Sequence, residues 1–156
     1  MRRFKQLLTE EEVKEILATH TGGVLSLVDA EGQPYGVPLS FVYDGGRTLY
    51  FHSAVAGHKI EAVRAHPQGS FCIIAKDEIK PEAFTTYFRS VIAQGRLVIV
   101  EDAGEILRGL RLLGEKYAPG IDSTDEISRS LSHVLVLKME IEDMTGKQAI
   151  ELVKPG

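Results

Sequence analysis

The chain has 156 residues and a mass of 17.2 kDa, and 44% of its residues are hydrophobic. This length and composition predict a single domain over residues 1–156 with a substantial core. A net charge of −4 and a pI near 5.7 argue against nucleic-acid binding, because such proteins present a basic surface. The single cysteine, Cys72, excludes an intrachain disulfide and is expected to fill the core.

The sequence also carries no signal for a membrane. No apolar run approaches the length of a membrane-spanning helix, and the charged start, residues 1–5, is not followed by an apolar segment. We therefore expect a soluble, cytoplasmic protein.

The first third of the chain reads as one helix followed by strands. Thr9 and Glu12 stand in capping-box order, so a helix is expected over residues 9–20 and is ended by Gly22 and Gly23. Strands are expected at residues 24–28, 35–43 and 47–53. Their short polar connections predict an antiparallel meander.

The middle of the chain begins with a short helix over residues 60–66, which Pro67 stops. A strand over residues 69–75 and a polar loop over residues 76–82 follow. Residues 85–100 form a β run longer than a typical strand. Gly95 near its middle predicts a bulge or bend, of the kind that a barrel requires.

The last third contains the best-marked helix. Asp102 and Glu105 form a second capping signal, and an apolar stripe runs on to Tyr117, so this helix should cover the barrel. A short helix or loop (residues 123–131), a final strand (134–141) and a turn (145–147) are expected after it.

These elements predict a mainly β (α+β) fold, a six-stranded antiparallel barrel with flanking helices. A doubly wound parallel sheet is excluded, because the first three strands follow one another through connections far too short for parallel crossovers.

The segment from Leu49 to Ile60, LYFHSAVAGHKI, has the pattern of an anion site. A β-rich run ends in His52 and Ser53, Gly57 permits a tight backbone, and Lys59 opens a helix. Helix N-termini expose unpaired N–H groups and the positive end of the macrodipole, so donors could converge there on a phosphate. An ordinary strand, turn and helix with polar loop residues is the alternative.

Together with PYGVPLSF (residues 34–41) and YFRSVIAQG (residues 87–95), this segment resembles the pyridoxamine 5′-phosphate oxidase-like superfamily of flavin-binding split barrels. The nitroimidazole-resistance branch is most similar, with Pro-Tyr…Pro-Leu-Ser-Phe, Phe-His-Ser-Ala…Gly-x-Lys and Tyr/Phe-x-Ser-Val…Gly in the same order. The resemblance covers about residues 5–147 and implies an FMN-binding split barrel with the cofactor at a homodimer interface.

The resemblance assigns cofactor-binding roles by position. Residues 36–41 match the strand beside the flavin ring, the end of the next strand matches the ribityl and phosphate site, and His58 with Lys59 matches a basic pair on the phosphate. Arg89 would be a second phosphate or interface cation, or equally the partner of a surface carboxylate. The implied cofactor-binding residues are Val37, Pro38, Leu39, Ser40, Phe51, His52, Ser53, His58, Lys59, Arg89, Ser90 and Gln94.

Several other uses of these residues are open or weak. Tyr35 and Phe41 are expected to be core or interface aromatics. A metal site is disfavoured, because no carboxylate or thiolate stands at ligand spacing between His52 and His58. A serine hydrolase is disfavoured, because the chain has no Gly-x-Ser-x-Gly motif. Neither a Rossmann nor a Walker glycine pattern occurs. His20, His66 and His133 are expected to be structural.

The chain also departs from pyridoxamine phosphate oxidase itself. It has no tryptophan, residues 148–156 offer no Arg-x-His element, and Gly36 and Phe41 stand where those oxidases place basic residues. That specific activity is therefore not expected, and an acidic chain is a poor host for a deazaflavin. The resemblance implies an FMN-dependent oxidoreductase that reduces a nitro compound or similar acceptor with electrons from NAD(P)H. A non-catalytic FMN- or haem-binding protein, with His52 as the iron ligand, is the alternative, and a degenerate member acting through its dimer surface is a third.

Overall fold

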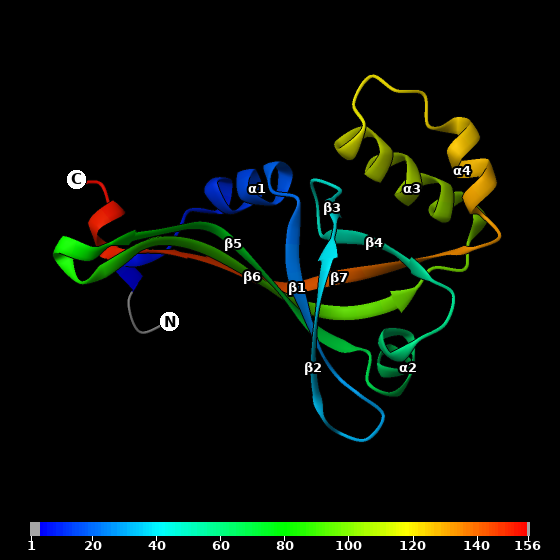
Figure 1. Ribbon diagram of the computed structural model, residues 1–156, viewed down its shortest axis with the longest axis horizontal. Coiled ribbons are helices and arrows are strands. Elements are labelled where there is room, and N and C mark those ends of the chain that lie inside the picture. The colour runs from blue at the N-terminus through cyan, green and yellow to red at the C-terminus, as the bar shows by residue number, and fades with distance from the viewer. Residues whose placement is uncertain (1–3, 156) are drawn as a thin grey trace.

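The computed structural model describes residues 4–155 and contains one antiparallel sheet of seven strands with helices around it (Figure 1). In chain order the elements are η1 (Phe4–Gln6), α1 (Glu10–Thr19), β1 (Gly22–Val28), β2 (Pro34–Ser40), β3 (Val42–Tyr43), β4 (Thr48–Ala54), α2 (His58–Ala65), β5 (Gln68–Lys80), η2 (Pro81–Ala83), β6 (Thr85–Ile99), α3 (Ala103–Tyr117), α4 (Thr124–Ser130), β7 (Val134–Gln148) and η3 (Ile150–Leu152). The strand order is β2-β1-β5-β6-β7-β4-β3. The predicted mainly β, antiparallel barrel class is confirmed, with one strand more than expected.

Both predicted helix starts are present. Thr9 accepts from the Glu12 amide while the Glu12 carboxylate accepts from the Thr9 amide, which satisfies two N-terminal donors of α1. The Asp102 carboxylate likewise accepts from the Glu105 amide at the start of α3. Because these signals are local, the sequence places both helix starts correctly.

The expected strand over residues 35–43 is divided at Phe41. Its first part, β2, pairs with β1, whereas β3 pairs with β4 at the other end of the strand order. Both hairpins of the predicted meander are therefore present, but the second is reduced to the two-residue pairing of β3 with β4, and β2 itself does not pair with β4. The chain crosses at Phe41 from one edge of the sheet to the other, and this crossing curls the sheet into a barrel that is open between β2 and β4.

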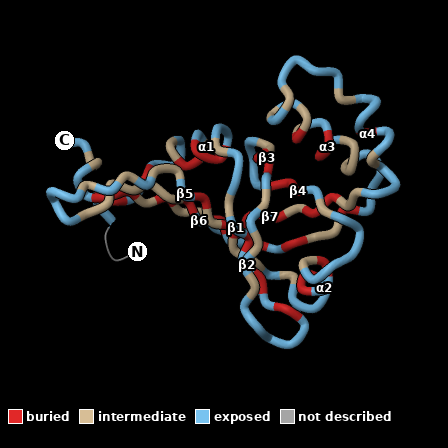
Figure 2. The backbone as a smooth tube through the Cα atoms, viewed as in Figure 1, coloured by how far each residue is buried: buried red, intermediate tan, exposed pale blue. Residues whose placement is uncertain are grey.

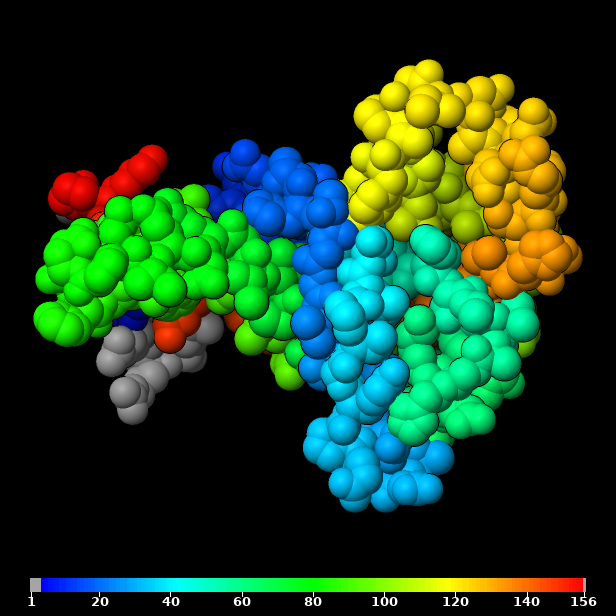
Figure 3. Space-filling model, viewed as in Figure 1, coloured from blue at the N-terminus to red at the C-terminus, as the bar shows by residue number. Residues whose placement is uncertain are grey.

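Other corrections concern strand lengths. Gly22 and Gly23 begin β1, and the helix has already ended at Thr19. Residues 76–80, expected as loop, continue β5 beyond a bulge, and residues 145–147, expected as a turn, lie inside β7 opposite β6. The outer parts of β5, β6 and β7 form an arm that projects from the barrel, and Figure 3 shows its β5 and β6 parts in green at the left.

Two apolar clusters fill the molecule. The larger lies inside the barrel, where Phe41, Phe51 and Phe71 meet edge to face at ring separations of 5.0 and 5.1 Å. The smaller lies between the outer side of the sheet and α3 with α4, and it includes Tyr50, Leu110 and Val136. Figure 2 shows buried residues concentrated in the barrel and in the faces of α1 and α3 that contact it. Helix α3 therefore covers the barrel as expected.

Gly95 lies at the predicted bulge. The register of β6 against β7 shifts between Gln94 and Gly95, and a Cβ atom at Gly95 would lie 2.1 Å from the carbonyl oxygen of Glu140. Only glycine permits this approach of two backbones.

We expect Gly95→Ala to lower the free energy of unfolding by about 2–3 kcal/mol, because the added methyl group forces β6 away from β7. Chemical denaturation would measure it. The control is Gly22→Ala, where the added Cβ would have no heavy atom within 4 Å and the change should stay within about 0.5 kcal/mol. Equal midpoints for both variants would contradict this account.

Candidate functional site

The open part of the barrel lies between β2 and β4. These strands contact each other, but within residues 4–155 they do not pair through backbone hydrogen bonds. On the side away from β7, β3 pairs only with Leu49 and Tyr50, so β4 from Phe51 to Ala54 has no second strand partner. Backbone N–H and C=O groups on such an edge need other partners. The predicted residues Phe51, His52 and Ser53 occupy this edge.

Exposed and partly buried side chains alternate along β2, and this alternation determines which of them can contact a ligand. The side chains of Val37 and Leu39 pack against the barrel core, whereas Pro38 and Ser40 are exposed. Phe51 is fully buried in the same core. Phe51 can therefore offer a ligand only its backbone groups, whereas Val37 and Leu39 are partly buried.

A groove of about 600 Å³ covers the outer face beside β2. Its lining residues come from β1, β2 and β5, and they are Gly22, Gly23, Val24, Ser26, Pro38, Leu39, Ser40, Cys72 and Ile74. Strand register places Ser90 opposite Ile74 and Gln94 opposite Ser70, so both predicted residues belong to the same sheet face. A neighbouring groove of about 510 Å³, which shares Ser26, is lined by Gln94.

Helix α2 lies at the end of β1 and supplies the basic pair. Gly57 is its N-cap with a φ of 136° and makes no side-chain cap, so the first amides of α2 remain open to an anion. Lys59 is half-buried, and burial lowers the pKa of its ammonium group. No carboxylate of residues 4–155 forms an ion pair with Lys59. A bound anion would restore the charge balance that this lysine lacks.

His58 has a partner that the sequence did not reveal. Its Nε2 atom lies 3.2 Å from Oδ2 of Asp29, and its ring meets Tyr35 edge to face at 4.5 Å. Asp29 also accepts from the amides of Glu31 and Gln33. Backbone hydrogen bonds, chiefly that from Gln33, and the contact with His58 hold the pKa of the Asp29 carboxyl below its usual range. His58 thus anchors the start of α2 to the β1–β2 hairpin.

Arg89 does not lie with the basic pair in the same protomer. It is in the projecting arm, where its Nε donates to Oε1 of the buried Gln148 at 3.1 Å, whereas α2 lies beyond the barrel at the lower right of Figure 1. It pairs with an amide oxygen and not with a surface carboxylate. A role for Arg89 at the phosphate would require the arm of a second copy.

The end of β2 is fixed by α3. The Tyr117 hydroxyl accepts from the Phe41 amide and can donate to the carbonyl of Phe41 or of Thr21. The Lys116 ammonium donates to the carbonyls of Leu17 and Phe41 and lies 3.8 Å from the centre of the Phe41 ring. Burial lowers the pKa of Lys116 to about 8. These contacts position Ser40, the residue next to Phe41.

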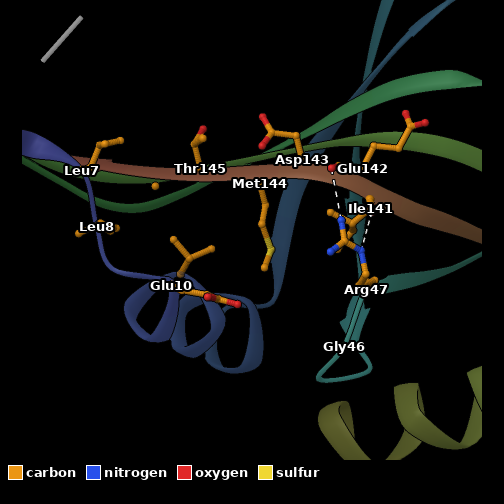
Figure 4. A pocket seen from close by; sticks show the side chains of 12 residues that line it. Leu7, Leu8, Glu10, Gly46, Arg47, Ile141, Glu142, Asp143, Met144 and Thr145 are labelled. Atoms are coloured by element: carbon orange, nitrogen blue, oxygen red, sulfur yellow. Dashed lines mark hydrogen bonds between the residues drawn. The ribbon is translucent and has the colours of Figure 1, made fainter. Parts of the chain in front are cut away.

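A further cavity of about 390 Å³ lies between α1, β7 and the β3–β4 turn. In Figure 4 Met144 points from β7 toward α1, and Arg47 donates to the carbonyls of Ile141 and Glu142. None of the predicted cofactor-binding residues lines it. No group of three or more His, Cys, Asp or Glu side chains suited to a metal occurs within residues 4–155. None of the helices in the same range has the length and apolarity to span a membrane.

Comparison with known proteins agrees with this architecture. The sequence profile of the pyridoxamine 5′-phosphate oxidase family matches residues 9–148. The chain belongs to this family. A search of curated proteins found no match.

Solved structures of several proteins resemble this family member. One, from Bacteroides thetaiotaomicron, is provisionally named a 5-nitroimidazole antibiotic resistance protein; it is 25% identical, with a TM-score of 0.76 and coverage of 91% of this chain and 86% of that one. An FAD-binding protein of Mesorhizobium loti is 26% identical, with a TM-score of 0.67 and coverage of 92% and 97%. The haem storage protein HutZ of Vibrio cholerae is 21% identical, with a TM-score of 0.66 and coverage of 89% and 94%, and shares the fold.

Four residues of this region were not predicted from the sequence: Asp29 and the groove residues Val24, Ser26 and Ile74. Alternation in β1 could have indicated that Val24 and Ser26 face outward, because Leu25 and Leu27 face the core. Nothing local links Asp29 to His58, which lies 29 residues later.

The Asp29–His58 contact gives a pH-dependent expectation. Because the folded-state pKa of Asp29 is lowered, its stabilisation is present above the usual value of 3.8 and is lost as the pH falls through the folded-state value. Asp29→Asn should therefore unfold at a lower temperature than the parent at pH 7, and the difference should shrink toward pH 3.

Thermal unfolding followed by circular dichroism across this range would measure the difference. Asp77→Asn, at an exposed position of the arm, is the matched control and should follow the parent at every pH. A difference for Asp29→Asn that is constant with pH would show that the carboxylate charge is not the cause.

Proposed function

We propose that this chain binds FMN in the opening between β2 and β4 and acts as an oxidoreductase. The observation that carries the proposal is the unpaired edge of β4 at residues 51–54, which faces β2 and has a basic, uncapped helix start at one end. FMN has a flat ring at one end and a phosphate at the other. The ring would suit the strand edges, and the phosphate would suit the basic start of α2. The family membership and the flavin-binding relative support the same proposal.

The residues divide into two groups by the part of FMN that they suit. Ser53, Lys59 and the first amides of α2 would hold the phosphate, with His58 positioned by Asp29. Ser40 and the β2 backbone would contact the polar edge of the ring, and Pro38 its face. Ser90 and Gln94 lie on β6, three strands from β2, and would reach the ring from a second copy. Bound FMN would supply the transfer of electrons between a nicotinamide donor and an acceptor.

The acceptor class follows from the relative named for 5-nitroimidazole resistance. We propose a nitro compound or a similar small acceptor, with NAD(P)H as the donor. In the two-electron reaction, a hydride from NAD(P)H and one proton convert a nitro group to a nitroso group and release one water molecule. The protein's part is to hold the ring, align the acceptor and exclude bulk water.

A second candidate is a haem- or flavin-binding storage protein. His52 favours it, since its exposed imidazole makes no hydrogen bond to another side chain or backbone group within residues 4–155 and could ligate iron. The similarity in fold to a haem storage protein also supports this candidate. A Soret band in the purified protein would favour this candidate over the first.

The central test is cofactor loading followed by turnover. The purified protein should show a flavin spectrum or gain one on titration with FMN, and the loaded protein should oxidise NAD(P)H faster with a nitroaromatic acceptor than free FMN does. No flavin uptake would refute the site, and uptake without turnover would favour storage.

Lys59→Ala should raise the Kd for FMN about 10- to 100-fold, because a charge-assisted hydrogen bond contributes about 1.5–3 kcal/mol. Fluorescence titration of the flavin would measure it. Arg64→Ala removes an exposed cation from the last turn of the same helix and is the control. Equal affinities for the two variants would place the phosphate elsewhere.

The groove face is also the proposed surface for a second copy. Val24, Ile74 and Ile92 are exposed on one face of adjacent strands around Cys72, and an apolar patch of this kind is typical of an interface. A homodimer would cover this patch and the cofactor together.

Ile74→Asp should therefore convert the dimer to monomer and weaken FMN retention, because the charge would be buried at the interface. Sedimentation velocity and flavin content would measure the two effects. Ile121→Asp is the control, since Ile121 is equally exposed (71% against 68%) but lies in the α3–α4 connection. A dimer that persists in Ile74→Asp would exclude this face.

A further inference from the structure

A separate cavity of about 430 Å³ lies beneath α3 and α4, beside the outer ends of β2 and β4. Its apolar wall consists of Leu110, Leu113, Ile127 and Val134, and its remaining lining residues are Ser40, His52, Gly114, Tyr117, Ser123, Glu126 and Ser130. This volume and this mixture of apolar and polar groups are typical of a small-molecule site.

The cavity presents polar groups that the protein does not itself use. Within residues 4–155, the side chains of Ser40, His52, Ser123 and Ser130 form no hydrogen bond to another protein group. The Tyr117 hydroxyl is instead occupied by the backbone of Phe41 and Thr21. The serine hydroxyls and the imidazole are therefore available to a ligand.

The cavity adjoins the proposed flavin site through shared residues. Ser40 lines both this cavity and the groove along β1 and β2, and His52 projects into the cavity from the unpaired edge of β4. A molecule in the cavity would lie next to the end of β2 at which the flavin ring is proposed.

The charge of the lining limits the class of ligand. Glu126 is the only carboxylate among the lining residues, it is exposed and pairs with Arg129, and no lysine or arginine lines the cavity. An anionic ligand would leave water without gaining a cation. Uncharged molecules fit this lining best.

We propose that this cavity is the acceptor site. It would take an uncharged aromatic molecule whose oxygen or nitrogen atoms accept hydrogen bonds from His52 and the serine hydroxyls. Helix α4 sets the size limit, and phosphorylated or carboxylated acceptors are selected against. The role of the bound molecule as electron acceptor rests on the proposed flavin function, whereas its binding in the cavity does not.

The test compares two serine-to-phenylalanine substitutions near the end of α4. Ser130→Phe places a ring at a half-buried lining position, whereas Ser132→Phe places the same ring at an exposed position outside the lining. The probes are 4-nitrobenzyl alcohol and 4-nitrobenzoate, which share a ring and a nitro group but differ in charge.

Binding to the purified protein is measured by titration calorimetry, and flavin content is measured separately by absorbance. We expect the alcohol to bind at least about tenfold more tightly than the benzoate, and Ser130→Phe to weaken the alcohol at least about tenfold while Ser132→Phe does not. Both variants should keep the parent's flavin content and unfolding temperature.

Equal binding of the two probes, no binding of the alcohol, or an unchanged affinity in Ser130→Phe would overturn the inference. If Ser130→Phe unfolds early, Ser130→Leu replaces it with the same expectation. Absence of flavin with normal probe binding would refute the proposed function and leave the cavity as a binding site. Normal flavin content without probe binding would refute the cavity alone.

Discussion

The arrangement of this protein depends on the interruption of the chain at Phe41. The Phe41 ring lies in the barrel core against Phe71, while its backbone is held by the Tyr117 hydroxyl and the Lys116 ammonium group. These contacts turn the chain out of β2 and into β3 at the opposite edge of the sheet. If residues 34–43 paired with β4 along their whole length, there would be no opening between β2 and β4. The edges of these two strands are free only because the pairing stops at Phe41.

Charge balance then distinguishes the two ends of the opening. Desolvation disfavours the Lys59 ammonium group, and no acidic side chain of residues 4–155 offsets this cost. Asp29 contacts His58, the residue that precedes Lys59, and the other carboxylate oxygen of Asp29 accepts from the amides of Glu31 and Gln33. The Lys59 ammonium group therefore has no carboxylate partner within residues 4–155, even though the chain as a whole is acidic. The cavity under α3 and α4 has the opposite character, with neutral donors and no basic lining.

Local signals in the sequence were sufficient for helix starts, the antiparallel class and the bulge at Gly95. Long-range pairing was not predictable in the same way. Nothing within residues 35–43 shows that Phe41 must leave the ladder, because its partners, Tyr117 and Lys116, lie more than 70 residues away. The fold, and not the sequence, separates the exposed Pro38 and Ser40 from Val37 and Leu39, and Arg89 from Lys59. The assigned cofactor roles stay predictions.

The unpaired edge of β4 has a consequence for how the protein would bind a ligand there. A ligand on that edge replaces water and leaves every strand ladder of the barrel intact, so loading requires no unfolding or reordering of the sheet. Occupancy then follows the concentration of free ligand by mass action. At a ligand concentration [L], binding raises the free energy of unfolding by RT ln(1 + [L]/Kd). If the proposed flavin is that ligand, the stability of the protein would rise with the flavin concentration.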